Sequence, residues 1–134
     1  MIKSDFQFSN PYLTNLVFIV NEEFEPNNSE EVNISNEINV SVQRPQTGNE
    51  AIVSLLIEIN KDISNRPFYL KIEIEAVFSW NNSMAEDMID TMLSKNAPAL
   101  LLAYARPIVA NITNSSPFPT YNLPFMNFLA SSES

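Results

Sequence analysis

Apolar and polar residues alternate along much of the first 80 residues, and this pattern predicts a β-sheet with one buried face. The clearest example ends at Trp80, where every even-numbered position from Phe68 onward is apolar and most odd-numbered ones are polar. Between such runs stand turn-forming residues, among them Pro45 and Gly48, the single glycine of the chain. The predicted strands cover residues 13–20, 32–42, 51–60 and 68–80.

After Trp80 the apolar spacing changes to that of a helix. Ser83 and Glu86 have the spacing of a capping box, which predicts a helix over 84–95. Pro98 suits the first turn of a second helix over 98–113, although Pro107 removes one hydrogen bond inside it. Strands followed by helices predict one α+β domain over 1–134, a four-stranded antiparallel sheet (meander) with the C-terminal helices packed on one face.

The segment 114–128 is rich in both proline and large apolar side chains. Because proline fixes φ and lacks an N–H, this segment is predicted to be an extended loop. Its prolines keep it from forming a helix or a central strand, so its side chains stay open to a partner. Aromatic and methionine side chains bury large areas without requiring one partner shape, which favours a promiscuous binding groove. The large residues of the loop are Phe118, Tyr121, Leu123, Phe125, Met126 and Phe128.

Composition narrows the function classes. Seven Lys and Arg against 16 Asp and Glu give a net charge of −9, and no basic cluster is present, which argues against nucleic acid as a partner. The chain has no histidine and no cysteine. It therefore lacks the commonest general base, the commonest metal ligand and any thiol nucleophile. We expect no catalytic residue, no metal site and no cofactor.

Two observations predict a cytoplasmic, soluble protein. The N-terminal residues contain no apolar stretch of signal-peptide length. The longest apolar run, 97–105, is far shorter than the roughly 20 residues that span a bilayer. We expect no membrane insertion.

Several motifs, in order along the chain, resemble the SecB family of export chaperones. The most specific is the C-terminal block, in which a Tyr-Ala-Arg helix is followed by a Phe-Pro loop and then by Asn-Leu and Asn-Phe pairs. Weaker similarity covers 21–27 and 75–80, and Asn96-Ala97-Pro98 opens the long helix. The residues of the C-terminal block are Tyr104, Ala105, Arg106, Phe118, Pro119, Asn122, Leu123, Asn127 and Phe128.

The resemblance implies a chaperone that holds unfolded or non-native polypeptides in a hydrophobic groove. It also implies a dimer of dimers, and apolar residues on more than one stripe of the helices support such an assembly. The implied groove is lined by Phe118, Tyr121, Leu123, Phe125, Met126, Phe78 and Trp80. The implied oligomer interface contains Leu70, Ile72, Ile74, Leu101 and Tyr104.

The resemblance further implies an acidic surface that docks a SecA-type translocation motor. Lys71 departs from this pattern, because members that dock the motor carry an acidic residue there. The candidate acidic residues are Glu22, Glu23, Glu25, Glu73 and Glu75. Two hypotheses remain open: a chaperone for export or for one dedicated client such as an antitoxin, and an interaction module with the same fold, one fixed partner and no general holding activity.

Overall fold

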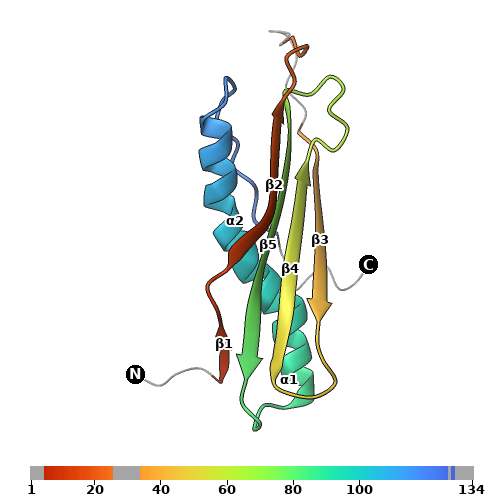
Figure 1. The fold of residues 1–134 in the computed structure, drawn as a ribbon, viewed down its shortest axis with the longest axis vertical. Helices are drawn as coiled ribbons and strands as arrows, with labels where there is room; N and C mark the ends of the chain where they lie inside the picture. Colours follow the sequence, from red (N-terminus) through yellow and green to blue (C-terminus); the bar gives the residue numbers. More distant parts are fainter. Residues whose placement is uncertain (1–4, 26–33, 127, 129–134) are drawn as a thin grey trace.

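The structure, a computed structural model, describes residues 5–25, 34–126 and 128. Within these residues an antiparallel sheet forms one layer and a long helical run forms the other (Figure 1). The predicted α+β class, with the helices on one face of an antiparallel sheet, is confirmed. The strands are β1 (Phe6–Phe8), β2 (Tyr12–Val20), β3 (Asn36–Gln43), β4 (Glu50–Ile59) and β5 (Phe68–Trp80), and the helical segments are α1 (Glu86–Thr91), η1 (Met92–Asn96) and α2 (Ala97–Asn114).

The order of the strands differs from a simple meander. Strands β3, β4 and β5 follow one another as antiparallel neighbours, but β2 pairs with β5 and not with β3. The short β1, which the sequence pattern did not predict, pairs with the other end of β5. The sheet is thus four strands wide, in the order β2 with β1, then β5, β4 and β3, and β2 and β3 form its two edges. This is a Greek-key connection.

The strand predicted over 32–42 is observed from Asn36 to Gln43, and residues 32 and 33 lie outside the described residues. The turn between β4 and β5 spans residues 60–67 and begins at Asn60, which has a left-handed φ of 58°. The Asn60 side-chain amide donates to the carbonyl of Phe68 at 2.9 Å, and its side-chain oxygen accepts from the backbone N–H of Ser35 at 3.1 Å. One buried asparagine therefore fixes the turn and the start of β3 together.

The two predicted helices form one run, joined by a π-helical turn at Met92–Asn96. Pro98 follows this turn and occupies the first turn of α2, as predicted. A proline in a regular helix would clash with the carbonyl four residues earlier, and the wider π turn relieves that clash. The predicted capping box is wrong: Ala85 stands at the N-cap, and Ser83 instead donates to the side chain of Asn81.

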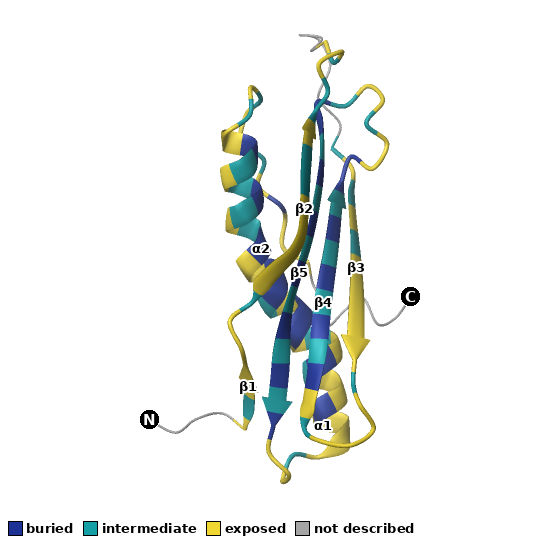
Figure 2. Cartoon of the chain, in the orientation of Figure 1, coloured by how far each residue is buried: buried dark blue, intermediate teal, exposed yellow. Residues whose placement is uncertain are grey.

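The core lies between the sheet and α2, and the alternating residues of β4 and β5 supply most of it (Figure 2). Six residues that were expected at other surfaces lie here. Leu70, Ile72, Ile74 and Leu101 are at most 2% exposed, so their assignment to an oligomer interface is wrong. The three β5 residues pair in register with β4 residues beneath the helix, Leu101 lies on α2, and all four belong to the chain's own core. Trp80 is also buried, together with Phe78.

Apolar residues on both edge strands face the helix side of the sheet but remain exposed. Register places Val40 and Val42 beside buried residues of β4, and Leu16 beside Ile72 of β5. A sheet of four strands is about 19 Å wide, whereas one helix with its side chains covers about 10–12 Å. Helix α2 packs over β4 and β5, and the edge strands are left largely uncovered (Figure 2).

Candidate functional site

The segment after α2 is extended and is fixed to the fold at several points. The hydroxyl of Thr113, a fully buried residue, donates to the carbonyl of Val109 at 2.9 Å and accepts from the backbone N–H of Tyr121 at 2.8 Å. The Tyr121 hydroxyl accepts a hydrogen bond from the side-chain amide of Asn36 at 2.6 Å. The segment is therefore tied to the last turn of α2 and to the first residue of β3.

Leu123 is the deepest anchor of this segment. Its side chain is 0% exposed and belongs to the core. The Nε–H of Arg106 donates to its carbonyl oxygen at 2.6 Å. This pair of contacts holds both the side chain and the backbone of the segment against α2.

The residues that follow Leu123 turn outward. The Phe125 ring is 74% exposed, the most of any large hydrophobic side chain in the described residues, and Met126 is 38% exposed. The guanidinium of Arg106 lies 3.7 Å from the centroid of the Phe125 ring, in a cation–π arrangement. An apolar surface is thus presented to solvent on a segment that is anchored two residues earlier.

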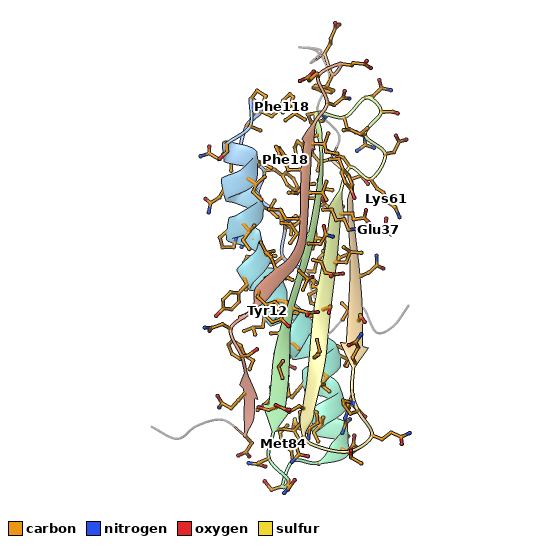
Figure 3. The ribbon with its side chains drawn as sticks, in the orientation of Figure 1. Tyr12, Phe18, Glu37, Lys61, Met84 and Phe118 are labelled. Atoms are coloured by element: carbon orange, nitrogen blue, oxygen red, sulfur yellow. The ribbon has the colours of Figure 1, made fainter. Side chains whose placement is uncertain are left out.

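The predicted groove residues separate into three groups. Phe125 and Met126 are exposed, and Phe118 and Tyr121 are half-buried. Phe118 lies at the C-terminal end of α2 (Figure 3), where its ring packs edge-on against Phe24 at 5.8 Å. The other predicted members, Leu123, Phe78 and Trp80, are buried within the chain, so their assignment as groove-lining side chains is wrong.

A second exposed apolar surface lies on the opposite flank of α2. Tyr104, which was expected at an oligomer interface, is 44% exposed and packs edge-on against Phe8 with ring centroids 6.4 Å apart. Leu13 and Leu16 of β2 are exposed on the same face of the sheet. Tyr104 and Arg106 are two residues apart, about 200° around a helix, so these two surfaces lie on different flanks of α2.

The far face of the sheet carries the predicted acidic residues of β5, and their neighbours hold them in place. Glu75 accepts hydrogen bonds from the hydroxyls of Tyr12 at 2.8 Å and Ser54 at 2.9 Å. The bond to Glu75 also raises the pKa of Tyr12. Glu73 accepts from Thr14. These contacts orient the carboxylates within a layer of hydroxyl groups.

The other predicted acidic residues do not join this group. Glu22, Glu23 and Glu25 follow the far end of β2 and are exposed. Because Glu73 pairs with Asn15, seven residues before Glu22, the two groups are on the order of 20 Å apart. Lys61 lies beside Glu37 (Figure 3), with its Nζ 3.8 Å from a carboxylate oxygen. The acidic charge is spread over the sheet surface and does not form one patch.

The described residues contain no cluster of three metal-binding side chains. In the same part of the chain, no helix has the length and apolar character needed to cross a membrane. The distinctive feature of the arrangement is anchored, exposed apolar surface, which is suited to binding polypeptide.

Comparisons with known proteins define the class. The family model described as preprotein translocase subunit SecB matches residues 3–131, which is nearly the whole chain. The chain therefore belongs to the SecB family, whose members are chaperones and not enzymes.

Two known proteins are similar to this chain. The protein-export protein SecB of Idiomarina loihiensis is 27% identical over 86 residues, which cover 64% of this chain and 52% of that protein. The match thus spans about half the length of that relative. The Mycobacterium tuberculosis Rv1957 SecB-like chaperone, solved in complex with a ChAD peptide from the Rv1956 HigA1 antitoxin, superposes with a TM-score of 0.71. It is 16% identical, and the match covers 91% of both chains, which shows a shared fold.

Proposed function

We propose that this protein is a molecular chaperone that holds non-native polypeptides, for export or for a dedicated client. The observation that carries the proposal is the exposed Phe125 and Met126 surface on a segment anchored by Leu123. Exposed apolar side chains usually collapse onto the protein's own surface. Here Pro124 and the fixed carbonyl of Leu123 keep the next residues extended and away from the core. Membership of the SecB family supports the same function.

The energetics suit reversible holding. Covering about 200 Å² of apolar surface contributes about 5 kcal/mol at 25 cal/mol per Å², before the entropy of ordering the client is subtracted. One such surface would bind a client only weakly. Several surfaces on one assembly would bind a long unfolded chain much more tightly, because each later contact is intramolecular.

An assembly of four chains, as a dimer of dimers, is part of this proposal. Edge strand β2 supports it, since β2 exposes Leu16 on one face and Ile19 on the other. An edge strand with apolar residues on both faces is a natural pairing surface for a second copy. Tyr104 and Met88, both exposed on the helical layer, offer a second contact. Light scattering tests this, and a mass near 15.2 kDa in place of about four times that value would refute it.

An export role would also involve a SecA-type motor in the cytoplasm. Glu73 and Glu75 on the uncovered face of the sheet, with the three acidic residues after β2, would supply the docking charges. Lys71 pairs with Val17, so it lies along β5 between Glu73 and the end of β2 that leads to the other acidic residues, and its positive charge weakens that surface. Calorimetry with the C-terminal segment of the motor is the test, and the absence of binding heat would remove this part of the proposal.

The second candidate function is a module with one fixed partner and no general holding activity. One observation favours it: the superposable SecB-like chaperone was solved with a peptide from one antitoxin. Such a module would bind one sequence tightly and give unrelated unfolded proteins no protection.

Suppression of aggregation separates the two functions. An unrelated protein is diluted from guanidinium in the presence of this chain, and light scattering is followed with time. The chaperone proposal predicts protection by the wild type and by Phe125→Leu, and reduced protection by Phe125→Asp. Phe125→Leu is the matched control, because it keeps an apolar side chain at the same place. No protection at several-fold excess of wild type would refute the general function and leave the dedicated one.

A further inference from the structure

Arg106 differs from Arg44 in the groups that it contacts. Among the described residues it forms no ion pair with a carboxylate, whereas Arg44 pairs with both Glu86 and Asp90. Its two contacts are both with the segment after α2: the carbonyl of Leu123 and the ring of Phe125. The chain has 16 Asp and Glu residues, yet the half-buried Arg106 binds a backbone oxygen and an aromatic ring and no carboxylate of the described residues.

These two contacts act on consecutive parts of the backbone. The Leu123 carbonyl belongs to the peptide bond before Pro124, so the bond from Arg106 at 2.6 Å fixes the plane of that peptide. The ring of Pro124 then fixes φ near −65°. Few backbone bonds between Leu123 and the Phe125 side chain are then free to rotate. The guanidinium, 3.7 Å from the ring centroid, restricts the side chain itself.

We propose that Arg106 is a positioning residue for client binding: it holds one face of the Phe125 ring against α2 and leaves the other face open to an apolar or aromatic side chain of the client. This inference rests on the proposed chaperone function. Lysine cannot replace Arg106. Only a guanidinium can donate its Nε–H to a carbonyl and at the same time stack its flat face on an aromatic ring.

The first test measures affinity for reduced, carboxamidomethylated lysozyme, a permanently unfolded and basic protein. Arg106→Gln is expected to weaken binding about three- to tenfold, through loss of the ring contact and the charged hydrogen bond. Arg106→Lys keeps the charge and should be nearly as weak. In a Phe125→Ala background, Arg106→Gln should change the affinity by less than about twofold, because the two residues act as one unit.

Arg44→Gln is the matched control. Arg44 also lies over an aromatic ring, that of Trp80 at 5.0 Å, but it joins β3 to α1 at another part of the molecule. Its loss should leave client affinity unchanged. Full affinity in Arg106→Lys would show that charge alone is enough and would overturn the proposal. Equal effects of Arg106→Gln with and without Phe125 would overturn it too.

The second test needs no client. In the variant F125W, fluorescence anisotropy of the new indole reports how firmly it is held, and the buried Trp80 supplies a constant background. Adding Arg106→Gln should lower the anisotropy while the melting temperature stays nearly the same. Unchanged anisotropy would overturn the proposal even if binding is weaker. If the wild type fails to bind the unfolded lysozyme, the general holding function is refuted, and the anisotropy still decides whether Arg106 holds residue 125.

Discussion

Leu123 and Phe125 are two residues apart, and their substitutions should have opposite effects. Leu123 is 0% exposed and Phe125 is 74% exposed, although both are large, apolar and next to Pro124. If the segment is anchored at one and open at the other, Leu123→Ala should lower the stability, and Phe125→Ser should lower client binding.

The structure sets the size of each effect. Replacing a fully buried leucine by alanine costs about 2–5 kcal/mol, because the removed atoms leave a cavity. With a urea m-value of about 2 kcal/mol per M, the unfolding midpoint should fall by about 1–2.5 M. Phe125→Ser removes one exposed cation–π contact, worth about 0.5–1 kcal/mol, so its midpoint should fall by less than about 0.5 M.

Urea unfolding followed by circular dichroism measures the midpoints, at one protein concentration because any assembly makes the midpoint depend on concentration. Affinity for unfolded lysozyme is measured in parallel on the folded variants. A midpoint loss in Phe125→Ser as large as that in Leu123→Ala would show that Phe125 is structural. An unchanged midpoint in Leu123→Ala would show that the segment is not docked in solution, and the site would be lost.

Three further predictions concern the fold. Asn60→Ala should lower the free energy of unfolding in urea by about 2–4 kcal/mol, because it leaves buried groups unpaired and places alanine at a left-handed φ of 58°. Asn60→Gly should cost less, because glycine tolerates that φ. Equal losses in the two variants would exclude backbone strain as a cause. Burial and the bond to Glu58 raise the pKa of Tyr69 from 10.0 to about 12, so this residue stabilises the fold below pH 10 and loses that effect as the pH rises towards 12. Tyrosinate absorbance should show a group titrating near pH 12 that is lost in Tyr69→Phe, while Tyr12, whose pKa is also raised, still titrates in that variant. An unchanged titration in Tyr69→Phe would contradict the assignment. Arg44 lowers the pKa of Glu86 from 4.5, so this ion pair stabilises the fold above pH 4.5 and loses that effect as the pH falls below it. In thermal melts, Arg44→Gln should therefore differ from wild type more at neutral pH than at pH 3.

The secondary structure was largely predictable because its signal is local. Period-two alternation located β4 and β5 to within a residue or so, since both strands pack one face on the helix. The three-residue β1 was missed because so short a strand has no measurable period. The pairing of β2 with β5 was also missed, because residues about 60 apart in the chain bring that pair together and no local pattern encodes it.

The site was predictable only in outline. Three prolines predicted an extended segment, but the direction of each side chain depends on Thr113, Arg106 and Asn36. These residues are 8, 17 and 85 positions from the groups that they bind, so no local pattern encodes the contacts. The wrong assignment of Phe78 and Trp80 to the groove could have been avoided from the sequence pattern alone. Both share the alternating face of β5 with Leu70 and Ile72, and a face covered by a helix cannot also line an open groove.

The width of the two layers explains why this fold keeps apolar surface exposed. A single helix covers about half of a four-stranded sheet, so the apolar rows of β4 and β5 are closed and their continuation onto β2 and β3 is open. Here the segment after α2 extends towards one edge, reaching β3 at Asn36, and leaves the β2 edge beside Tyr104 open. The exposed strips therefore follow from the architecture itself, and a substitution that widened the helical layer should reduce binding while increasing stability.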